Sequence, residues 1–204
     1  MIESLISFSI ATLFLALSPG PDNLYVIAQS LANGTKSGIA TTIGLISGCI
    51  VHTTLLAFGV SAIIAASETL FYGLKVMGAC YLLFLAYNVF RSNVHFDLKD
   101  KASKKSYSQL FKQGVIMNLV NPKILIFFLA FFPGFLWDEY QYTIYQFYVL
   151  GILFMAISFI VFSGLAILAG YISTTLNKNK NVSVLLKWTQ IVVFVGIAVF
   201  ILIS

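Results

Sequence analysis

The sequence predicts an all-α membrane protein in which six transmembrane helices form two inverted repeats of three helices each. Three observations support this prediction. The composition is strongly apolar, with 59% hydrophobic and 9% charged residues among 204. Six apolar segments are long enough to span a bilayer, and the first and fourth are interrupted at corresponding places by prolines.

The composition excludes an ordinary soluble domain, in which about 25% of residues are charged. The mean hydropathy is +0.95. The net charge of +5 does not indicate nucleic-acid binding, because the basic residues are concentrated in the connections between apolar segments. The lipid bilayer is therefore the expected surrounding, and no nucleic-acid partner is expected.

A membrane-spanning helix needs about 20 apolar residues, and we assign six such segments. In chain order they are 4–32, 38–66, 69–91, 112–134, 142–172 and 183–203. The first is broken at Pro19-Gly20-Pro21 and the fourth at Asn121-Pro122, so we expect helices 1 and 4 to be broken near the midplane. The second and fifth are long, which favours tilt or an interfacial end.

Positive charges predict the orientation, because Lys and Arg are enriched in cytoplasmic loops. Half of the twelve Lys and Arg residues lie in or beside the connection between the third and fourth segments, and they are Arg91, Lys99, Lys101, Lys104, Lys105 and Lys112. We therefore predict that 92–111 is a basic cytoplasmic loop. Lys36, Lys178 and Lys180 mark the two other cytoplasmic connections. Both termini are then extracytoplasmic. We treat 1–204 as one transmembrane domain, with 1–91 as the first repeat and 112–204 as the second.

The two breaks predict internal symmetry. Ser18-Pro19 and Asn121-Pro122 lie about half the chain apart, each within the first helix of a three-helix half. Three spans per half is an odd number, so the second half must be inverted relative to the first. Inverted repeats with broken helices at corresponding positions are typical of secondary transporters. The alternative is that both prolines only kink their helices for packing.

A charged residue follows each break. An interior proline costs about 3 kcal/mol, and an aspartate at membrane depth costs roughly 2.5–3.5 kcal/mol on insertion scales. The charged residues are Asp22 after the first break and Lys123 after the second. Buried charges of opposite sign are expected to pair or to face a cavity. They could form an exchangeable ion pair or a permanent one, or Asp22 could simply cap its own half-helix.

Such a site suits a zwitterion. Free N–H groups at half-helix starts attract a carboxylate, and free carbonyls with an aspartate attract an ammonium. His52 could relay protons or could be a hydrogen-bonded histidine of the bundle. We expect substrate or proton binding, without a metal or cofactor, at the following residues: Asp22, Lys123, Pro19, Gly20, Pro21, Asn23, Asn118, Asn121, Pro122 and His52.

Motifs of membrane-embedded enzymes are missing from the sequence. It contains no HExxH or GxSxG pattern and no carboxylate dyad, so we predict that the chain is not an enzyme. A small amino acid is the expected substrate of a transporter with this site. The alternative function is a non-transporting membrane scaffold or lipid-handling protein.

The combined motifs resemble those of the lysine exporter (LysE/RhtB) family of amino-acid exporters. The matching stretches are Leu17-Ser-Pro-Gly-Pro-Asp22, Gly38 to Gly48, Lys75-x-x-Gly78-Ala-x-Tyr81-Leu82, and Gly114-x-x-x-Asn118-x-x-Asn121-Pro122-Lys123 with Phe127-Phe128 and Phe131-Phe132-Pro133. The resemblance covers nearly the whole chain. It implies export of an amino acid or derivative across a bacterial inner membrane by proton antiport. It leaves open which amino acid is exported and whether the protein works alone or as a homodimer.

Overall fold

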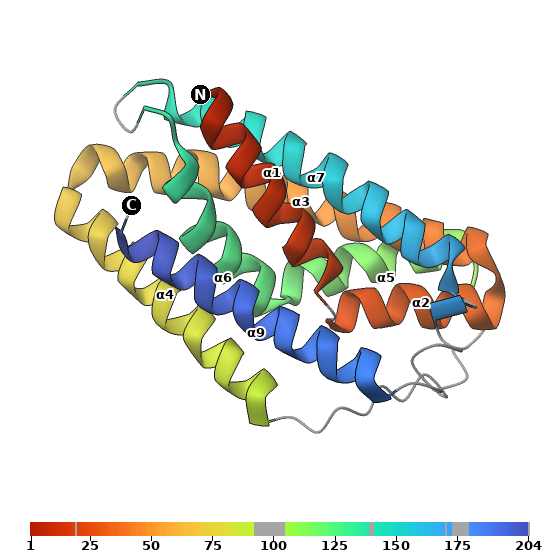
Figure 1. Cartoon of the computed structure of the whole chain (residues 1–204). Helices are drawn as coiled ribbons and strands as arrows, with labels where there is room; N and C mark the ends of the chain where they lie inside the picture. The colour runs from red at the N-terminus through yellow and green to blue at the C-terminus, as the bar shows by residue number, and fades with distance from the viewer. Residues whose placement is uncertain (19, 92–104, 139–140, 170, 173–179, 204) are drawn as a thin grey trace.

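The structure is a computed structural model, and it describes residues 1–18, 20–91, 105–138, 141–169, 171–172 and 180–203. All regular structure in these ranges is helical (Figure 1). The first half of the chain contains α1 (Ile2–Leu17), α2 (Pro21–Asn33), α3 (Thr35–Ala66) and α4 (Glu68–Arg91). The second half contains α5 (Tyr107–Val120), α6 (Pro122–Phe131), the 3₁₀ helix η1 (Phe132–Phe135), α7 (Thr143–Ile167) and α9 (Lys180–Ile203).

The helices confirm an all-α membrane protein. In the described part of the chain, α3, α4 and α7 are each long and apolar enough to cross a membrane, and up to five spans result if each bent pair counts as one. The apolar part of α9, Lys187–Ile203, is shorter. The arrangement as six spans in two inverted repeats therefore stays a prediction.

Both predicted breaks occur in the structure. The axes of α1 and α2 differ by 56°, and the axis of α5 differs by 55° from that of Ile124–Phe135. In each pair the second helix begins at a proline, Pro21 or Pro122. Proline is favoured at this position because the first N–H of a helix has no intrahelical acceptor. The prolines therefore start new helices here and do not kink continuous ones.

One helix begins earlier than predicted. α5 starts at Tyr107, within the stretch 92–111 that the sequence assigns to a loop. A capping box explains this start: the Gln109 N–H donates to Ser106 Oγ at 3.3 Å, and the Ser106 N–H donates to Gln109 Oε1 at 2.9 Å. These two bonds satisfy backbone donors that would otherwise lack partners. Residues 92–104 lie outside the described residues.

α3 lies at the centre of the bundle and packs mainly against α5 and α7. A Cβ atom added at Gly44 would meet the backbone of Phe111, and one added at Gly114 would meet the backbone of Thr41 and Gly44. The glycines therefore let the backbones of α3 and α5 approach each other, as small residues do between membrane helices. The GxxxG pattern of Gly44 and Gly48 is used within this chain.

A cluster of aromatic rings fills the bundle between α1, α6, η1 and α7. We call it the phenylalanine cluster; its members are Phe8, Phe127, Phe128, Phe131, Phe132, Phe135 and Phe154, all buried. Several rings are in direct contact. Phe128 and Phe132 stack with their centroids 4.2 Å apart, and the Phe8 and Phe132 centroids lie 5.0 Å apart in an edge-to-face arrangement, a favourable geometry for such rings.

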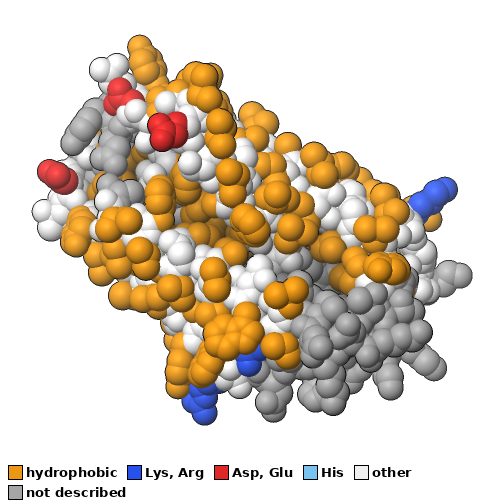
Figure 2. All heavy atoms as spheres, in the orientation of Figure 1, with side chains coloured by type: hydrophobic (Ala, Val, Ile, Leu, Met, Phe, Trp, Pro, Cys, Tyr) orange, Lys and Arg blue, Asp and Glu red, His pale blue; other side chains and the backbone are white. Residues whose placement is uncertain are grey.

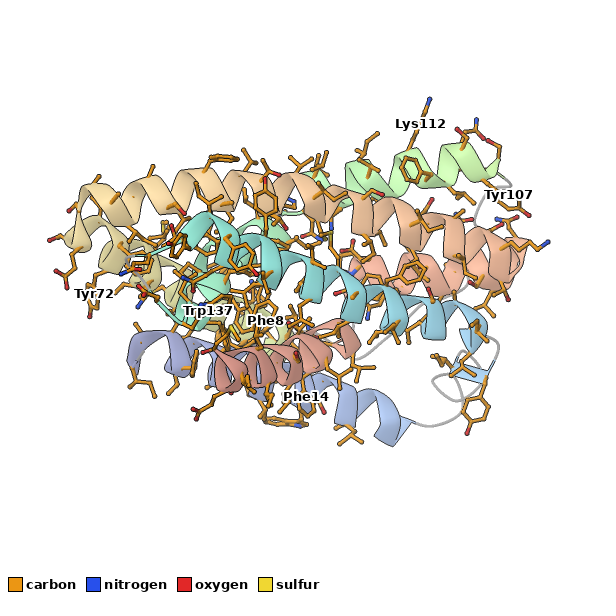
Figure 3. All side chains as sticks on the ribbon, turned by 90° about the horizontal axis from the view of Figure 1, so that it is seen from above. Phe8, Phe14, Tyr72, Tyr107, Lys112 and Trp137 are labelled. Atoms are coloured by element: carbon orange, nitrogen blue, oxygen red, sulfur yellow. The ribbon has the colours of Figure 1, made fainter. Side chains whose placement is uncertain are left out.

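The surface agrees with a membrane environment. Figure 2 shows hydrophobic side chains over most of the visible face, with acidic side chains near the end at which the chain begins and basic side chains away from it. The start of α1 and the end of α9 lie at the same end of the bundle (Figure 1). Tyr107 and Lys112 lie at the opposite end from Tyr72 (Figure 3).

Candidate functional site

The two breaks meet at a small cavity inside the bundle. Its volume is about 60 Å³. It is lined by residues from α1 and α2, the first break, α3, the α5–α6 junction and α7: Leu15, Ala16, Ser18, Gly20, Pro21, Asp22, Asn23, Leu45, Ile46, Cys49, Asn118, Asn121, Ile124, Phe154, Ser158 and Phe162. Segments from both halves of the chain therefore build one site.

The first break leaves backbone groups unpaired, and Asn23 satisfies some of them. Its Nδ2 donates to Ala16 O at 2.8 Å and to Ser18 O at 3.3 Å. These carbonyl oxygens at the end of α1 therefore have a hydrogen-bond donor. Gly20 is extended and precedes α2 without a side-chain cap. N–H groups in the first turn of a helix have no intrahelical acceptor. The start of α2 therefore presents backbone donors beside the cavity.

Asp22 occupies the first turn of α2 and is 7% exposed. A carboxylate is favoured there by the positive end of the helix dipole. Its Oδ2 accepts a hydrogen bond from Asn121 Nδ2 at 3.3 Å. Asn121 is the residue between α5 and α6, so this bond joins the first break directly to the second.

The second break is short. The Asn121 N–H donates to Asn118 O at 3.2 Å, and Asn121 O accepts from the Ile124 N–H at 3.1 Å. Lys123 lies in the first turn of α6, but its side chain is outside the described residues, as is Pro19. The expected contact between Asp22 and Lys123 therefore stays a prediction.

Asn118 is buried where α3 and α5 meet. Its Nδ2 donates to Cys49 Sγ at 3.4 Å, and its backbone carbonyl lies 3.2 Å from His52 Nε2. A Cβ atom at Gly48 would collide with the Asn118 side chain, so this glycine makes room for the amide. Among the described residues, Asn118 Oδ1 and Ser18 Oγ are buried without a hydrogen-bond partner. Both residues line the cavity.

The sequence-based set is only partly assembled at the cavity. Six of its members line it: Gly20, Pro21, Asp22, Asn23, Asn118 and Asn121. Pro122 begins α6 and is not a lining residue. His52 lies behind Asn118, with its ring centroid 5.6 Å from that of Phe128, and it is not a lining residue either.

Sequence reasoning missed the contribution of α7 and of Ser18 and Cys49. Phe154, Ser158 and Phe162 line the cavity from α7. Their spacing of four residues places them on one helix face, but many residues of this apolar helix share such spacing, so only the packing identifies the face. For Cys49, the available signal was its position directly after Gly48.

In the described part of the chain, no cluster of three or more His, Cys, Asp or Glu side chains could hold a metal ion. The lining of the cavity instead combines a buried carboxylate, amide groups and hydroxyl groups with apolar side chains. This combination is suited to a small molecule with charged ends and little bulk.

Comparison with known proteins identifies relatives of the whole chain. The family model described as LysE type translocator matches residues 13–204. The homoserine/homoserine lactone efflux proteins of Salmonella typhimurium and Salmonella typhi are each 30% identical over 181 residues, covering 89% of this chain and 87% of theirs. An uncharacterized membrane protein of Pseudomonas aeruginosa is 30% identical, with 81% of each chain covered. No solved structure matches.

Proposed function

Because the chain belongs to the LysE-type translocator family, as its motifs predict, we propose that it is a secondary transporter that exports an amino acid or a close derivative from the cytoplasm. The family is one of translocators, so the prediction that the chain is not an enzyme is confirmed. The observation that carries the proposal is the partly buried hydrogen bond between Asn121 and Asp22, which joins the two helix breaks at a common cavity.

The groups around the cavity support an amino acid as the ligand. The Asp22 carboxylate would bind the ammonium group, with the unpartnered Asn118 Oδ1 and Ser18 Oγ as further acceptors. The first-turn N–H groups of α2 would bind the carboxylate, because helix starts favour anions. Lys123 would add a positive charge at the start of α6. Either Asp22 or His52 would take up the proton if export is coupled to proton antiport.

We propose that transport occurs by alternating access between two inverted repeats in one transmembrane domain. The six spans would be α1 with α2, α3, α4, α5 with α6 and η1, α7, and α9. Residues 1–91 would form the first repeat and 112–204 the second. The common location of the start of α1 and the end of α9 supports this topology (Figure 1).

The membrane would be the bacterial inner membrane, with both termini extracytoplasmic. Glu3, Glu68 and Asp138 lie near the starts of α1, α4 and α7, whereas Lys36, Arg91 and Lys112 lie near the start of α3, the end of α4 and the start of α5. The positive-inside rule places the basic group in the cytoplasm. Reporter fusions should read cytoplasmic at Ser103 and extracytoplasmic at Ser204, and the reverse readings would refute this orientation.

The Salmonella relatives named as homoserine efflux proteins suggest the first substrate to test. Cells or proteoliposomes loaded with labelled homoserine, threonine or lysine should release at least one of them faster when the wild-type protein is present. Asp22→Asn keeps the shape of the side chain but removes its charge, and we expect it to abolish this release.

The matched control is Glu3→Gln, which removes an exposed charge from the first turn of α1. It should export at the wild-type rate. If Asp22→Asn reaches the membrane in normal amounts and exports as fast as the wild type, the role proposed for Asp22 is wrong. If the wild type releases no amino acid, the proposed function is wrong.

A further inference from the structure

α7 presents a regular stripe of three residues to the cavity. Phe154, Ser158 and Phe162 are spaced by four, and all three line it. They are 7%, 2% and 9% exposed, respectively. A small hydroxymethyl group therefore lies between two large rings on one helix face. We call the position of this small side chain, one helical turn from each ring, the notch.

The notch lies on the apolar side of the site. The polar groups Asp22, Asn121 and Ser18 come from the two breaks, whereas α3 contributes Leu45, Ile46 and Cys49, two of which are aliphatic. An amino acid held through its ammonium and carboxylate at the breaks must direct its side chain towards α3 and α7. Ser158 is smaller than every other side chain that these two helices contribute to the cavity.

The Ser158 hydroxyl differs from those of two threonines on α3. On α3, Thr41 and Thr42 donate to the carbonyls of Ser37 and Gly38, each at 3.0 Å. Such bonds to the residue four positions earlier are usual for Ser and Thr in helices. Among the described residues, Ser158 is not seen to make such a bond, a feature that it shares with Thr12, Thr53 and Ser163. Its polarity is not used to stabilise the helix.

We infer that Ser158 is a specificity-determining residue that receives the substrate's side chain and limits its length. This inference rests on the proposed export of an amino acid through the cavity. A larger side chain at this position would fill the notch between Phe154 and Phe162, so long substrates would be excluded while short ones still fit. A hydrophobic pocket changes the rate ratio of two substrates that differ by one methylene by roughly tenfold or more.

The test is a comparison of efflux rates from proteoliposomes for alanine and for the longest amino-acid side chain that the wild-type protein exports. Ser158→Thr and Ser158→Val add nearly the same volume, but only the first keeps the hydroxyl. We expect both to lower the long-to-alanine efflux ratio by at least about tenfold. Ser158→Ala should leave this ratio unchanged or raise it.

The matched control is Ser163→Val, which makes the same substitution on the same helix at a serine that does not line the cavity. It should keep the wild-type ratio. If Ser158→Val fails to fold, the long-to-alanine efflux ratio of Ser158→Thr alone tests the inference.

An unchanged ratio in the Ser158→Thr and Ser158→Val variants, or an equal change in Ser163→Val, would refute the role of Ser158 while amino-acid export stands. Absence of amino-acid efflux from the wild type would instead refute the proposed function.

Discussion

The two helix breaks meet at one cavity, but the surrounding helices hold them differently. In the second break, α5 is in close backbone contact with α3 through Gly44 and Gly114, and α6 packs against α4, where Gly78 makes room for Ala130. In the first break, α1 buries only Phe8, Thr12 and Ala16 and leaves most other side chains exposed.

This difference indicates which unit can move. Side chains that interlock at backbone distance allow few alternative positions, because packed interiors do not deform continuously. α1 and α5 each bury about one residue per turn, but α1 contains no glycine through which its backbone could approach a neighbour as α5 approaches α3. α1 can therefore shift at lower cost. α2 buries six of its thirteen residues. We therefore expect the α5–α6 unit to be the fixed wall of the site and α1 to be its moving wall during transport.

The largest expected effect concerns the fixed wall. Gly44→Leu should prevent α3 and α5 from packing, because the added side chain meets the Phe111 backbone, which has no room to move. Extra methylenes that the core can partly accommodate cost about 1–3 kcal/mol, whereas a whole leucine side chain here must separate the two helices. We therefore expect little folded protein by size-exclusion chromatography in detergent. Gly59→Leu on the same helix faces open space and should fold normally. Equal yields would contradict the fixed-wall assignment.

The next effect concerns the phenylalanine cluster, which holds α6 and η1 in place. Phe132→Ala removes a fully buried ring that stacks on Phe128, and it should destabilise the protein by about 3–5 kcal/mol. The control, Phe14→Ala on α1, removes a ring that is 47% exposed and should change stability by less than about 0.5 kcal/mol. Thermal unfolding in detergent measures both. A similar loss of thermal stability in both variants would contradict the assignment of a fixed wall and a moving wall.

A smaller effect is expected at the first break itself. Asn23→Ala leaves Ala16 O and Ser18 O without their side-chain donor, at a cost of about 1–3 kcal/mol. If α1 moves relative to α2 during transport, the variant should lose export rate to a greater extent than its lower stability explains. Efflux normalised to folded protein would then fall, and a normalised rate equal to wild type would count against this movement.

The smallest effect is the coupling between the breaks. A hydrogen bond to a charged group contributes about 1.5–3 kcal/mol to the free energy of unfolding. The bond from Asn121 to Asp22 is long, at 3.3 Å, so we expect a contribution at the weak end of this range. A double-mutant cycle with Asp22→Asn and Asn121→Ala should give a stability coupling near or below the lower value. Additive single effects would show that the two residues are close but not coupled.

The sequence predicts the fold well where a single residue decides. Pro21 and Pro122 set the starts of α2 and α6, because proline has no N–H group to donate to a preceding turn. Glycine spacing indicated close helix packing but not its partner, which is set by where Phe111 and Asn118 reach α3. The start of α5 depends on a capping box at Ser106 and Gln109, a signal that a search for apolar segments overlooks.

The site could be predicted on its polar side only. Asp22 and Asn121 stand out because polar residues are costly at membrane depth. Ser158 and Phe154 do not, because a serine and aromatic rings occur throughout the apolar segments of this chain. His52 was included for its chemistry, and the structure places it behind Asn118 rather than at the cavity. Only tertiary packing decides which apolar face meets the substrate.

The central claim is that the exported amino acid binds between the two breaks. It is tested most directly by thiol labelling of a Ser18→Cys variant in a chain without Cys49 and Cys80, with Ser108→Cys at the exposed start of α5 as the control. The exported amino acid should slow labelling at position 18 and leave labelling at position 108 unchanged. Labelling at position 18 that is equally fast with and without this amino acid would contradict the claim.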